Sequence, residues 1–487
     1  MTRNGLSLGS AVLALLVCTA CNPHFEPTAI RFDVAGNALD AHDGALRRFD
    51  GTYYLYGTSY DCGFEWFNGG RFCGFKVYSS PDLVHFTDKG LLFDPADWQK
   101  ICVGNLIGCY RPHIIKNPNT NRYVLWFNSY ENAGGYHVME SSEPDRGFME
   151  VGIPRLAVNA GPEVSKNGDE NLFIDNDGTG YVIYTDVNGH YDQIIERLTP
   201  DYHNGTGQYV RLNLFKTEAP SLFRRGDRYY VTVSDPNCAY CSGTGASYLT
   251  SLDPLSGWSS AMKFSDSSCG GQPADTSLLS TDFGDIYLFQ SDLWTGDRNE
   301  ALANVFWGPV QFDESGALRT LNCSPSAPFI ERAGLLPPPG ADIGSGYLGF
   351  HAVSDVGAAV RAQGFRAGRT GTLTLVSFAA YQYDRPDGPL TTTLSRLDES
   401  THSELEVASQ TWLPAQIGWS PRMVSWSLNI PVLAGQHYLL RMQATLSHGS
   451  YGSLYSETGS DADAVAQWTD SKGTQRGGMI KFYTVIQ

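Results

Sequence analysis

The chain has 487 residues and a formal net charge of −17, with 42% hydrophobic and 17% charged residues. This length is enough for two or three domains, each with its own core. The excess of hydrophobic over charged residues excludes a disordered chain, and the negative charge excludes binding to nucleic acid through the phosphate backbone. Because Tyr, Phe, Trp and Gly are all abundant, the composition fits a strand-rich protein with aromatic surfaces for a ligand.

Residues 1–20 have the features of a targeting segment. Arg3 precedes an apolar run that begins at Ala11 and is too short to span a bilayer, which is typical of an export signal. The run ends in Cys18-Thr-Ala-Cys21, which resembles a bacterial lipobox with Cys21 as the lipidated residue. We therefore predict an exported lipoprotein at the cell surface or a membrane, which contacts that membrane only through the lipid anchor; a plain secretion signal is the alternative.

Export favours disulfides among the eight cysteines that follow the leader, although eight cysteines allow 105 pairings. Cys62–Cys73 and Cys102–Cys109 are close enough in sequence to close single loops, and we predict both. Cys238-Ala-Tyr-Cys241 has the spacing of a redox or zinc pair. A disulfide is favoured there, because neither a second such pair nor a nearby His completes a tetrahedral metal site.

Short strand patterns recur over residues 27–333, each after a polar turn such as Asn176-Asp-Gly178 or Arg225-Gly-Asp227, which are hairpin signals. The clearest patterns span residues 51–57, 121–127, 180–185, 227–232 and 284–289. One polar anchor residue stands before each pair of strands, and successive anchors are about 50 to 70 residues apart, the length of a four-stranded propeller blade. The anchors are Asp43, Arg111, Asp169, Glu218 and Gln272.

This spacing predicts an all-β, five-bladed propeller in which each anchor lies on an innermost strand and faces the central axis. A β-sandwich of similar length is the alternative. Residues 334–346 contain a run of three prolines between glycines and predict a stiff linker.

Residues 347–487 have the strand patterns of a smaller β-sandwich. This C-terminal domain contains four tryptophans that could form a surface on which sugars stack: Trp412, Trp419, Trp426 and Trp468. The domain is then a carbohydrate-binding module. The alternative is a purely structural sandwich in which tryptophans, Trp426 above all, belong to the core.

Three acidic residues, Asp43, Asp169 and Glu218, each stand just before an apolar strand in three different repeats. A single acid in that position is usually a turn cap, but a propeller would bring three together around one funnel. Carboxylates that converge raise one another's pKa, so one can stay protonated while another is ionised. Glycoside hydrolysis needs such a pair.

The surroundings of these acids form an ordered set of motifs. Asp43 stands ten residues before Tyr53-Tyr54, Asp169 precedes a Leu-Phe-Ile-Asp-Asn-Asp-Gly hairpin, and Glu218-Ala-Pro is followed by Tyr229-Tyr230. With these motifs, the region from about Ala38 to Glu331 resembles glycoside hydrolase family 43, the five-bladed propeller glycosidases of clan F.

Further motifs, Ala41-His42, Arg111-Pro112 and Gly271-Gln-Pro273 among them, are similar to the exo-β-1,3-galactanase-like and related galactosidase branches. In those galactanases the position of Asp43 is often Gly, and a Gln matching Gln272 has been implicated in place of the base. This chain has both residues, and it has Tyr110 where the galactanases place a Glu.

The resemblance implies an inverting hydrolase in which Glu218 is the general acid, Asp43 the general base, and Asp169 the residue that tunes the pKa of Glu218 and orients the substrate. The acid and base should then be about 6.5–9.5 Å apart, to admit a water. Asp40 is a substitute for the base.

Substrate contacts are expected from residues near these acids: Asp40, His42, Trp66, Arg111, Gln272, Asp292 and Trp294. For Trp294 a place in the core is equally compatible with the sequence, and for His42 a packing role. The expected substrate is a galactose- or arabinose-containing polysaccharide or oligosaccharide, with β-1,3-galactan and arabinogalactan favoured, and the protein is expected to be a monomer. No cofactor is required; relatives hold a calcium in the central channel, for which the sequence identifies no ligand.

The alternative function is a non-catalytic, glycan-binding surface lipoprotein that keeps the propeller, since Gly44 and Glu170 follow two of the acids where Pro is common. An adhesion or scaffold protein that uses the C-terminal domain has less support. The discriminating observation is whether the three acids converge.

Overall fold

The computed structural model describes residues 30–487, apart from 64–70, 103–107, 130–134, 159–166, 236–242, 282–283, 296–297, 325–339, 346–349, 399, 402, 457–465 and 470–474. The predicted leader with Cys21, the side chain of Trp66, the Cys238–Cys241 pair and most of the predicted linker lie outside these residues. No helix in the described part of the chain is both long and apolar enough for a membrane span.

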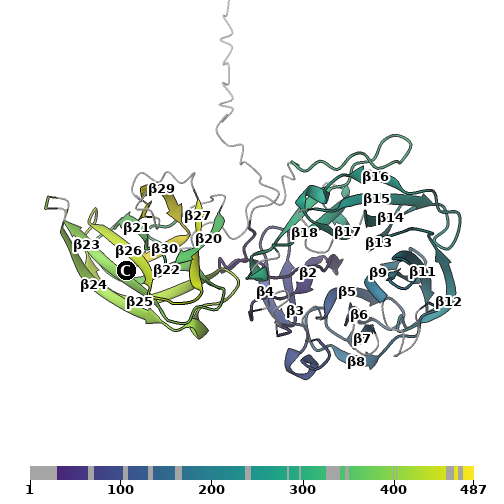
Figure 1. The fold of residues 1–487 in the computed structure, drawn as a ribbon, viewed down its shortest axis with the longest axis horizontal. Coiled ribbons are helices and arrows are strands. Elements are labelled where there is room, and N and C mark those ends of the chain that lie inside the picture. The colour runs from purple at the N-terminus through teal and green to yellow at the C-terminus, as the bar shows by residue number, and fades with distance from the viewer. Residues whose placement is uncertain are drawn as a thin grey trace, which may run out of the picture.

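The first part of the chain is a five-bladed β-propeller, whose sheets are arranged around a common axis (Figure 1). Each blade is an antiparallel meander that is continuous in sequence. The first blade consists of β1 (Leu46–Phe49), β2 (Thr52–Thr58), β3 (Phe75–Ser80) and β4 (Thr87–Leu91). The second consists of β5 (Tyr110–Asn117), β6 (Arg122–Asn128), β7 (Tyr136–Ser141) and β8 (Met149–Gly152).

The remaining blades follow in chain order. The third blade has β9 (Asn167–Ile174), β10 (Gly180–Asp186), β11 (Asp192–Leu198) and β12 (Gly205–Arg211). The fourth has β13 (Glu218–Arg225), β14 (Arg228–Asp235), β15 (Gly245–Ser251) and β16 (Met262–Ser265). The fifth has β17 (Gln272–Thr281), β18 (Gly284–Leu293) and β19 (Asn304–Pro309).

The hairpins form where the sequence predicts them. Gly178 and Gly226 have φ angles of 82° and 65°, the left-handed backbone that a tight turn needs and that glycine adopts without strain. Each predicted strand of the propeller is the second strand of a blade, from β2 to β18, and its apolar residues are buried between neighbouring sheets. Each polar anchor lies on or just before the innermost strand of its blade. The predicted all-β propeller is confirmed.

The C-terminal domain is a β-sandwich that lies beside the propeller (Figure 1). One sheet contains β20 (His351–Val356), β22 (Gly371–Tyr383), β25 (Arg422–Val432), β27 (Ser450–Ser456), β28 (Ala466–Thr469), β29 (Gln475–Ile480) and β30 (Phe482–Ile486). The other contains β21 (Arg361–Arg366), β23 (Leu390–Asp398), β24 (Ser403–Trp412) and β26 (His437–Ala444). Four short 3₁₀ turns complete the described structure: Pro95–Trp98, Ser268–Gly270, Glu300–Leu302 and Pro414–Gln416.

The tryptophans of the sandwich whose side chains the structure describes do not form one sugar-stacking surface. Trp426 is buried in the core between the sheets, as the structural alternative expects, and Trp412 packs against the same core. Trp419 lies instead at the boundary with the propeller. Nothing is described of the side chain of Trp468.

The axis of the propeller contains one carboxylate shared by four blades. Asp275 of β17 accepts hydrogen bonds from Arg47 of β1 at 2.5 Å, Asn171 of β9 at 2.7 Å and Ser221 of β13 at 2.9 Å, and from Ser277 on its own strand. Burial opposes ionisation of Asp275, but Arg47 above all, with the Ser277 hydroxyl, lowers its pKa to about 2. The innermost strands are thus joined through an ionised group.

The ring closes between the first and fifth blades through side chains. Besides the Arg47–Asp275 ion pair, Arg48 donates to the carbonyl of Ser280 at 2.6 Å and the Tyr53 hydroxyl donates to the same carbonyl at 2.8 Å. An apolar cluster that includes Leu46 and Leu279 fills the same boundary. Among the described residues, no strand from the first blade joins the sheet of the fifth blade, and no strand from the fifth blade joins the sheet of the first.

Three disulfides are described. Cys62–Cys73 and Cys102–Cys109 are both present, which confirms the two predicted pairs. Cys269–Cys323 joins residues on either side of the fifth blade. Sequence spacing could not identify this pair because 54 residues separate its cysteines.

Replacing Asp275 by Ala should lower the free energy of unfolding by up to about 3 kcal/mol, because Arg47 keeps a partly buried charge without its partner. Asp275→Asn keeps one oxygen acceptor, so its free energy of unfolding should fall less. Denaturant unfolding of both variants measures the effect, with Asp266→Ala, a change at an exposed carboxylate, as the control. An Asp275→Ala protein as stable as the control would show that the axial ion pair does not hold the blades together.

Candidate active site

The innermost strands begin with irregular backbone that directs polar side chains toward one end of the axis. Asp43, Arg111 and Ala219 have φ angles of 51°, 56° and 51°, which residues other than glycine rarely adopt. The register of the blade shifts after Glu218, as it does beside Arg111. Such bulges re-aim side chains at the rims of sheets. The local backbone is thus built to position these groups.

Arg111 connects the second blade to Asp169 of the third. Its Nε and Nη2 lie 3.2 and 3.3 Å from the two oxygens of Asp169, while Nη1 donates to the carbonyls of Pro273 and Ala274. Asp169 also accepts from the backbone N–H of Ala219 at 3.0 Å, which fixes it beside Glu218. Three blades therefore meet at Asp169, with a fourth joined through Arg111.

Glu218 is a buried acid in this group, with 5% of its surface exposed. Burial, and next the negative charge of Asp169, raise its pKa to about 8. One contact reaches it from the fifth blade, because Gln272 Nε2 donates to its Oε2 at 3.4 Å. Trp294 Nε1 in turn donates to Gln272 Oε1 at 3.1 Å, which orients the amide. Glu218 thus stays protonated near neutral pH and can serve as a proton donor.

Asp43 is the second buried acid, and it belongs to the first blade. The Thr58 hydroxyl donates to its Oδ1 at 2.7 Å, and its backbone N–H donates to Asp292 Oδ1 at 3.1 Å. Burial raises the pKa of Asp43 to about 7, Arg111 opposes this rise, and Asp292 adds to it. At pH above 7 the group is ionised and can accept a proton.

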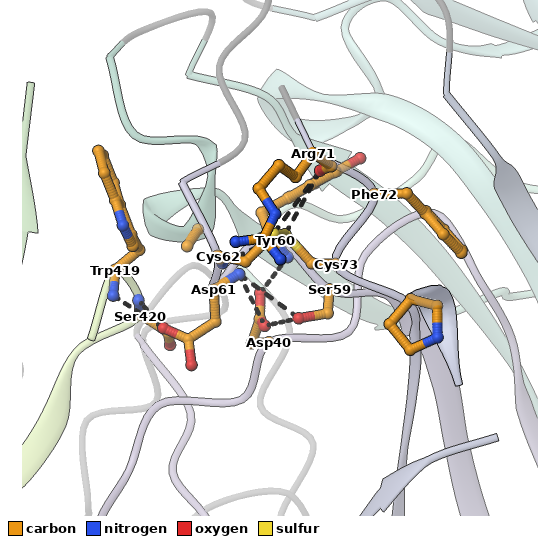
Figure 2. The surroundings of a disulfide bond; sticks show 12 residues. Asp40, Ser59, Tyr60, Asp61, Cys62, Arg71, Phe72, Cys73, Trp419 and Ser420 are labelled. Atoms are coloured by element: carbon orange, nitrogen blue, oxygen red, sulfur yellow. Dashed lines mark hydrogen bonds between the residues drawn. A yellow bond between two sulfur atoms is a disulfide. The ribbon is translucent and has the colours of Figure 1, made fainter. Parts of the chain in front are cut away.

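Asp40 and His42 organise the rim beside Asp43. Asp40 accepts from the Ser59 hydroxyl at 2.5 Å (Figure 2) and from the backbone N–H of Tyr60 at 2.9 Å, and His42 Nε2 lies 3.2 Å from it. The His42 ring stacks on Tyr60 with centroids 4.9 Å apart. Since both carboxylate oxygens of Asp40 are engaged, its contacts are those of a residue that shapes the loop after β2.

The structure thus brings together most of the residues that the sequence predicts for the site: Asp40, Asp43, His42, Arg111, Asp169, Glu218, Gln272, Asp292 and Trp294. Trp66 lies outside the described residues. Sequence reasoning missed Thr58 and Tyr60, which contact Asp43 and His42, because neither belongs to a motif of its own. It also missed that Glu170 is buried, because the motif before the hairpin was assigned to its neighbour Asp169.

The described residues do not fit a calcium on the axis. No group of three or more His, Cys, Asp or Glu side chains in the described ranges could hold a metal. The axial carboxylate of Asp275 already has the guanidinium of Arg47 as its cation. His113 faces the same cluster, 3.5 Å from Arg47, and burial lowers its pKa to about 3, so it is neutral there.

Glu170 is a further buried carboxyl next to Asp169. It is 1% exposed, and neither of its oxygens has a hydrogen-bond partner among the described residues. Burial, and next the charge of Asp169, raise its pKa well above the ordinary value of 4.5. The protein therefore holds a neutral acid at a position directly beside the Arg111–Asp169 pair.

A family model covers much of the propeller. Residues 37–265 match the model described as Glycosyl hydrolases family 43. That segment contains Asp43, Arg111, Asp169 and Glu218 and ends before Gln272. No curated protein matches the chain.

Several solved structures share the fold at low sequence identity. An exo-β-1,3-galactanase from Phanerochaete chrysosporium is 18% identical, with a TM-score of 0.53, over 89% of this chain and 100% of that one. An exo-β-1,3-galactanase from Clostridium thermocellum is 20% identical, with a TM-score of 0.51, over 94% of this chain and 86% of that one. A β-1,3-galactosidase with galactodeoxynojirimycin is 22% identical, with a TM-score of 0.52, over 60% of this chain and 97% of that one.

The neutral state of Glu170 predicts a pH-dependent stability. Its raised pKa means that the folded protein keeps a proton that the unfolded chain loses above pH 4.5, so stability falls by about 1.4 kcal/mol per pH unit from there up to the folded pKa. Glu170→Gln removes this contribution. The variant should match the wild type at pH 4.5 and have the higher Tm at pH 9. Equal slopes of Tm against pH in the two proteins would contradict a neutral Glu170; Glu314→Gln, at an exposed site, is the control.

Proposed function

We propose that the propeller of this chain is a family 43 glycoside hydrolase domain and that it cleaves galactose-containing polysaccharide by inverting acid–base hydrolysis. The observation that carries this proposal is the pair of buried carboxyls, Glu218 and Asp43, with pKa values raised to about 8 and about 7 around one arginine. Inverting hydrolysis requires one protonated and one ionised carboxyl at the same bond.

In the proposed reaction Glu218 gives its proton to the glycosidic oxygen while the bond from that oxygen to the anomeric carbon breaks. Asp43 accepts a proton from the water that attacks the same carbon from the opposite face. The new bond forms there, and the configuration at the carbon inverts. Asp169, held by Arg111, keeps the pKa of Glu218 high and orients the donor.

β-1,3-Galactan is the favoured substrate. Support comes from the shared fold with galactanases and a galactosidase, and from the position of Gln272, which lies against Glu218. Unlike the galactanase pattern, this chain also has Asp43 with its Thr58 and Asp292 partners, and Tyr110 is buried in the nearby aromatic cluster. An ordinary carboxylate base therefore suits this chain.

Hydrolysis of β-1,3-galactan, arabinogalactan, arabinan and xylan tests the proposal. We expect release from the galactans, with NMR showing that the first product has the inverted anomeric configuration. The wild-type kcat/KM should rise up to about pH 7, where Asp43 ionises, and fall above about pH 8, where Glu218 loses its proton.

Glu218→Gln should lower the rate about 10²–10⁴-fold and remove the fall at alkaline pH, because the titrating donor is gone. Thr232→Ser, a small change at a buried hydroxyl of the same blade, is the matched control. A Glu218→Gln enzyme with the wild-type rate would exclude Glu218 as the acid. Glycan binding without hydrolysis by the wild type would favour the glycan-binding lipoprotein.

The protein is further proposed to act outside the cytoplasm as a lipoprotein. The predicted leader of residues 1–20, followed by Cys21, supports this, and so do three disulfides, which persist in oxidising compartments. Expression of the full chain in a bacterium should place it in the membrane fraction, and Cys21→Ala should abolish labelling by a fatty acid. Labelling of the variant as strong as that of the wild type would reject Cys21 as the lipidation site.

A further inference from the structure

The C-terminal sandwich is attached to the rim of the propeller through the loop that leads into β25. Asp61, next to the Cys62–Cys73 disulfide, accepts hydrogen bonds from the backbone N–H groups of Trp419 and Ser420 at 2.8 and 2.7 Å (Figure 2). It also forms an ion pair with Arg422. This loop is therefore held by the same propeller segment that Asp40 organises.

Both polar backbone groups of Trp419 bind to the propeller. Its N–H donates to Asp61, and its carbonyl accepts from Asn299 Nδ2 at 2.8 Å. Asn299 is fully buried and also donates to the carbonyl of Gln382 in β22. From the sandwich side, the Gln382 amide donates to the carbonyls of Pro414 and Ile417. The loop is thus fixed from both domains, which makes the position of Trp419 precise.

The indole of Trp419 lies over the loop beside the site. A Cβ atom at Gly63 would come within 2.9 Å of the ring, so only glycine fits under it. The ring packs on an aromatic and disulfide cluster that also includes Tyr60, Tyr110 and Trp294, and it remains partly exposed. It is the one described tryptophan of the sandwich that contacts this cluster.

This cluster is connected to Glu218 by hydrogen bonds. Trp294, which shares it with Trp419, donates to Gln272, and Gln272 donates to Glu218. Tyr60, from the same cluster, stacks on His42 beside Asp43. A partly exposed indole that a second domain holds rigidly at this rim is suited to stack on the apolar face of a sugar ring.

We infer that Trp419 is a sugar-binding platform that the sandwich contributes to the catalytic site. There it binds a sugar unit adjacent to the one whose glycosidic bond is hydrolysed. This inference rests on the proposed function, since it names a specificity-determining residue for that reaction. The two domains then form one substrate site, and preference for an oligosaccharide over a single sugar depends on the sandwich.

The experiment compares β-1,3-galactotriose with β-galactosyl fluoride, which carries only one sugar. Trp419→Ala should lower kcat/KM for the trisaccharide about tenfold, through KM, and leave the fluoride unchanged. Trp419→Phe should recover most of the loss, because a flat ring remains. Asp61→Ala should give a weaker form of the same pattern, because it releases the backbone that positions the indole.

Trp412→Ala is the control, since Trp412 packs within the sandwich and contacts none of this cluster. It should lower Tm and leave both kcat/KM values unchanged. Equal losses on both substrates in Trp419→Ala would show a purely structural contact and overturn the inference, as would no loss on either.

Titration of galactotriose and of galactose into Glu218→Gln, with and without Trp419→Ala, separates this inference from the proposed function. If the wild type hydrolyses neither substrate but Trp419→Ala weakens binding of the trisaccharide alone, the proposed hydrolysis fails and the platform stands. If neither sugar binds, both proposals fall.

Discussion

The propeller depends on one buried carboxylate. Asp275 accepts hydrogen bonds from four of the five blades, and it stays ionised at the axis because Arg47 supplies the opposite charge. Apolar clusters fill the boundaries between neighbouring blades, and polar contacts such as Arg48 to Ser280 add to them where the first blade meets the fifth. The Arg47–Asp275 ion pair joins the innermost strands of these two blades, so it requires a closed ring. Gln272, which begins the same strand, lies at the rim beside the acid Glu218.

The candidate site contains several buried carboxyl groups that lie near a single arginine, Arg111. Arg111 lies near Asp43, Asp169, Glu170 and Asp292, and it pairs directly with Asp169 alone. Burial favours the neutral form of every carboxyl, so those without a direct cation keep their protons to higher pH. In the proposed reaction, the division between proton donor and acceptor therefore follows from the position of one guanidinium.

Repetition made much of this visible in the sequence. Asp43, Asp169 and Glu218 recur at equivalent points of a regular pattern, and strand alternation with Gly turns predicted the blades around them. Arg47 and Asp275 were not predicted, because a polar residue inside a strand pattern looks like a solvent-facing position until five strands are wrapped around an axis. The sequence pattern groups Trp419 with the other tryptophans on a surface of the sandwich. Its actual partners, Asp61 and Asn299, lie far away in sequence, and no local pattern encodes a contact between domains.

The closure of the ring has a consequence for how the molecule comes apart. The first and fifth blades are joined by side chains from Arg47, Arg48 and Tyr53, whereas Cys269–Cys323 encloses the fifth blade in a covalent loop of its own. Partial opening at this seam would therefore separate the fifth blade from the first while the disulfide still holds the two ends of the fifth blade together. Asp275 would stay with the fifth blade, bonded to Ser221 of the fourth, in position to pair with Arg47 again when the ring closes.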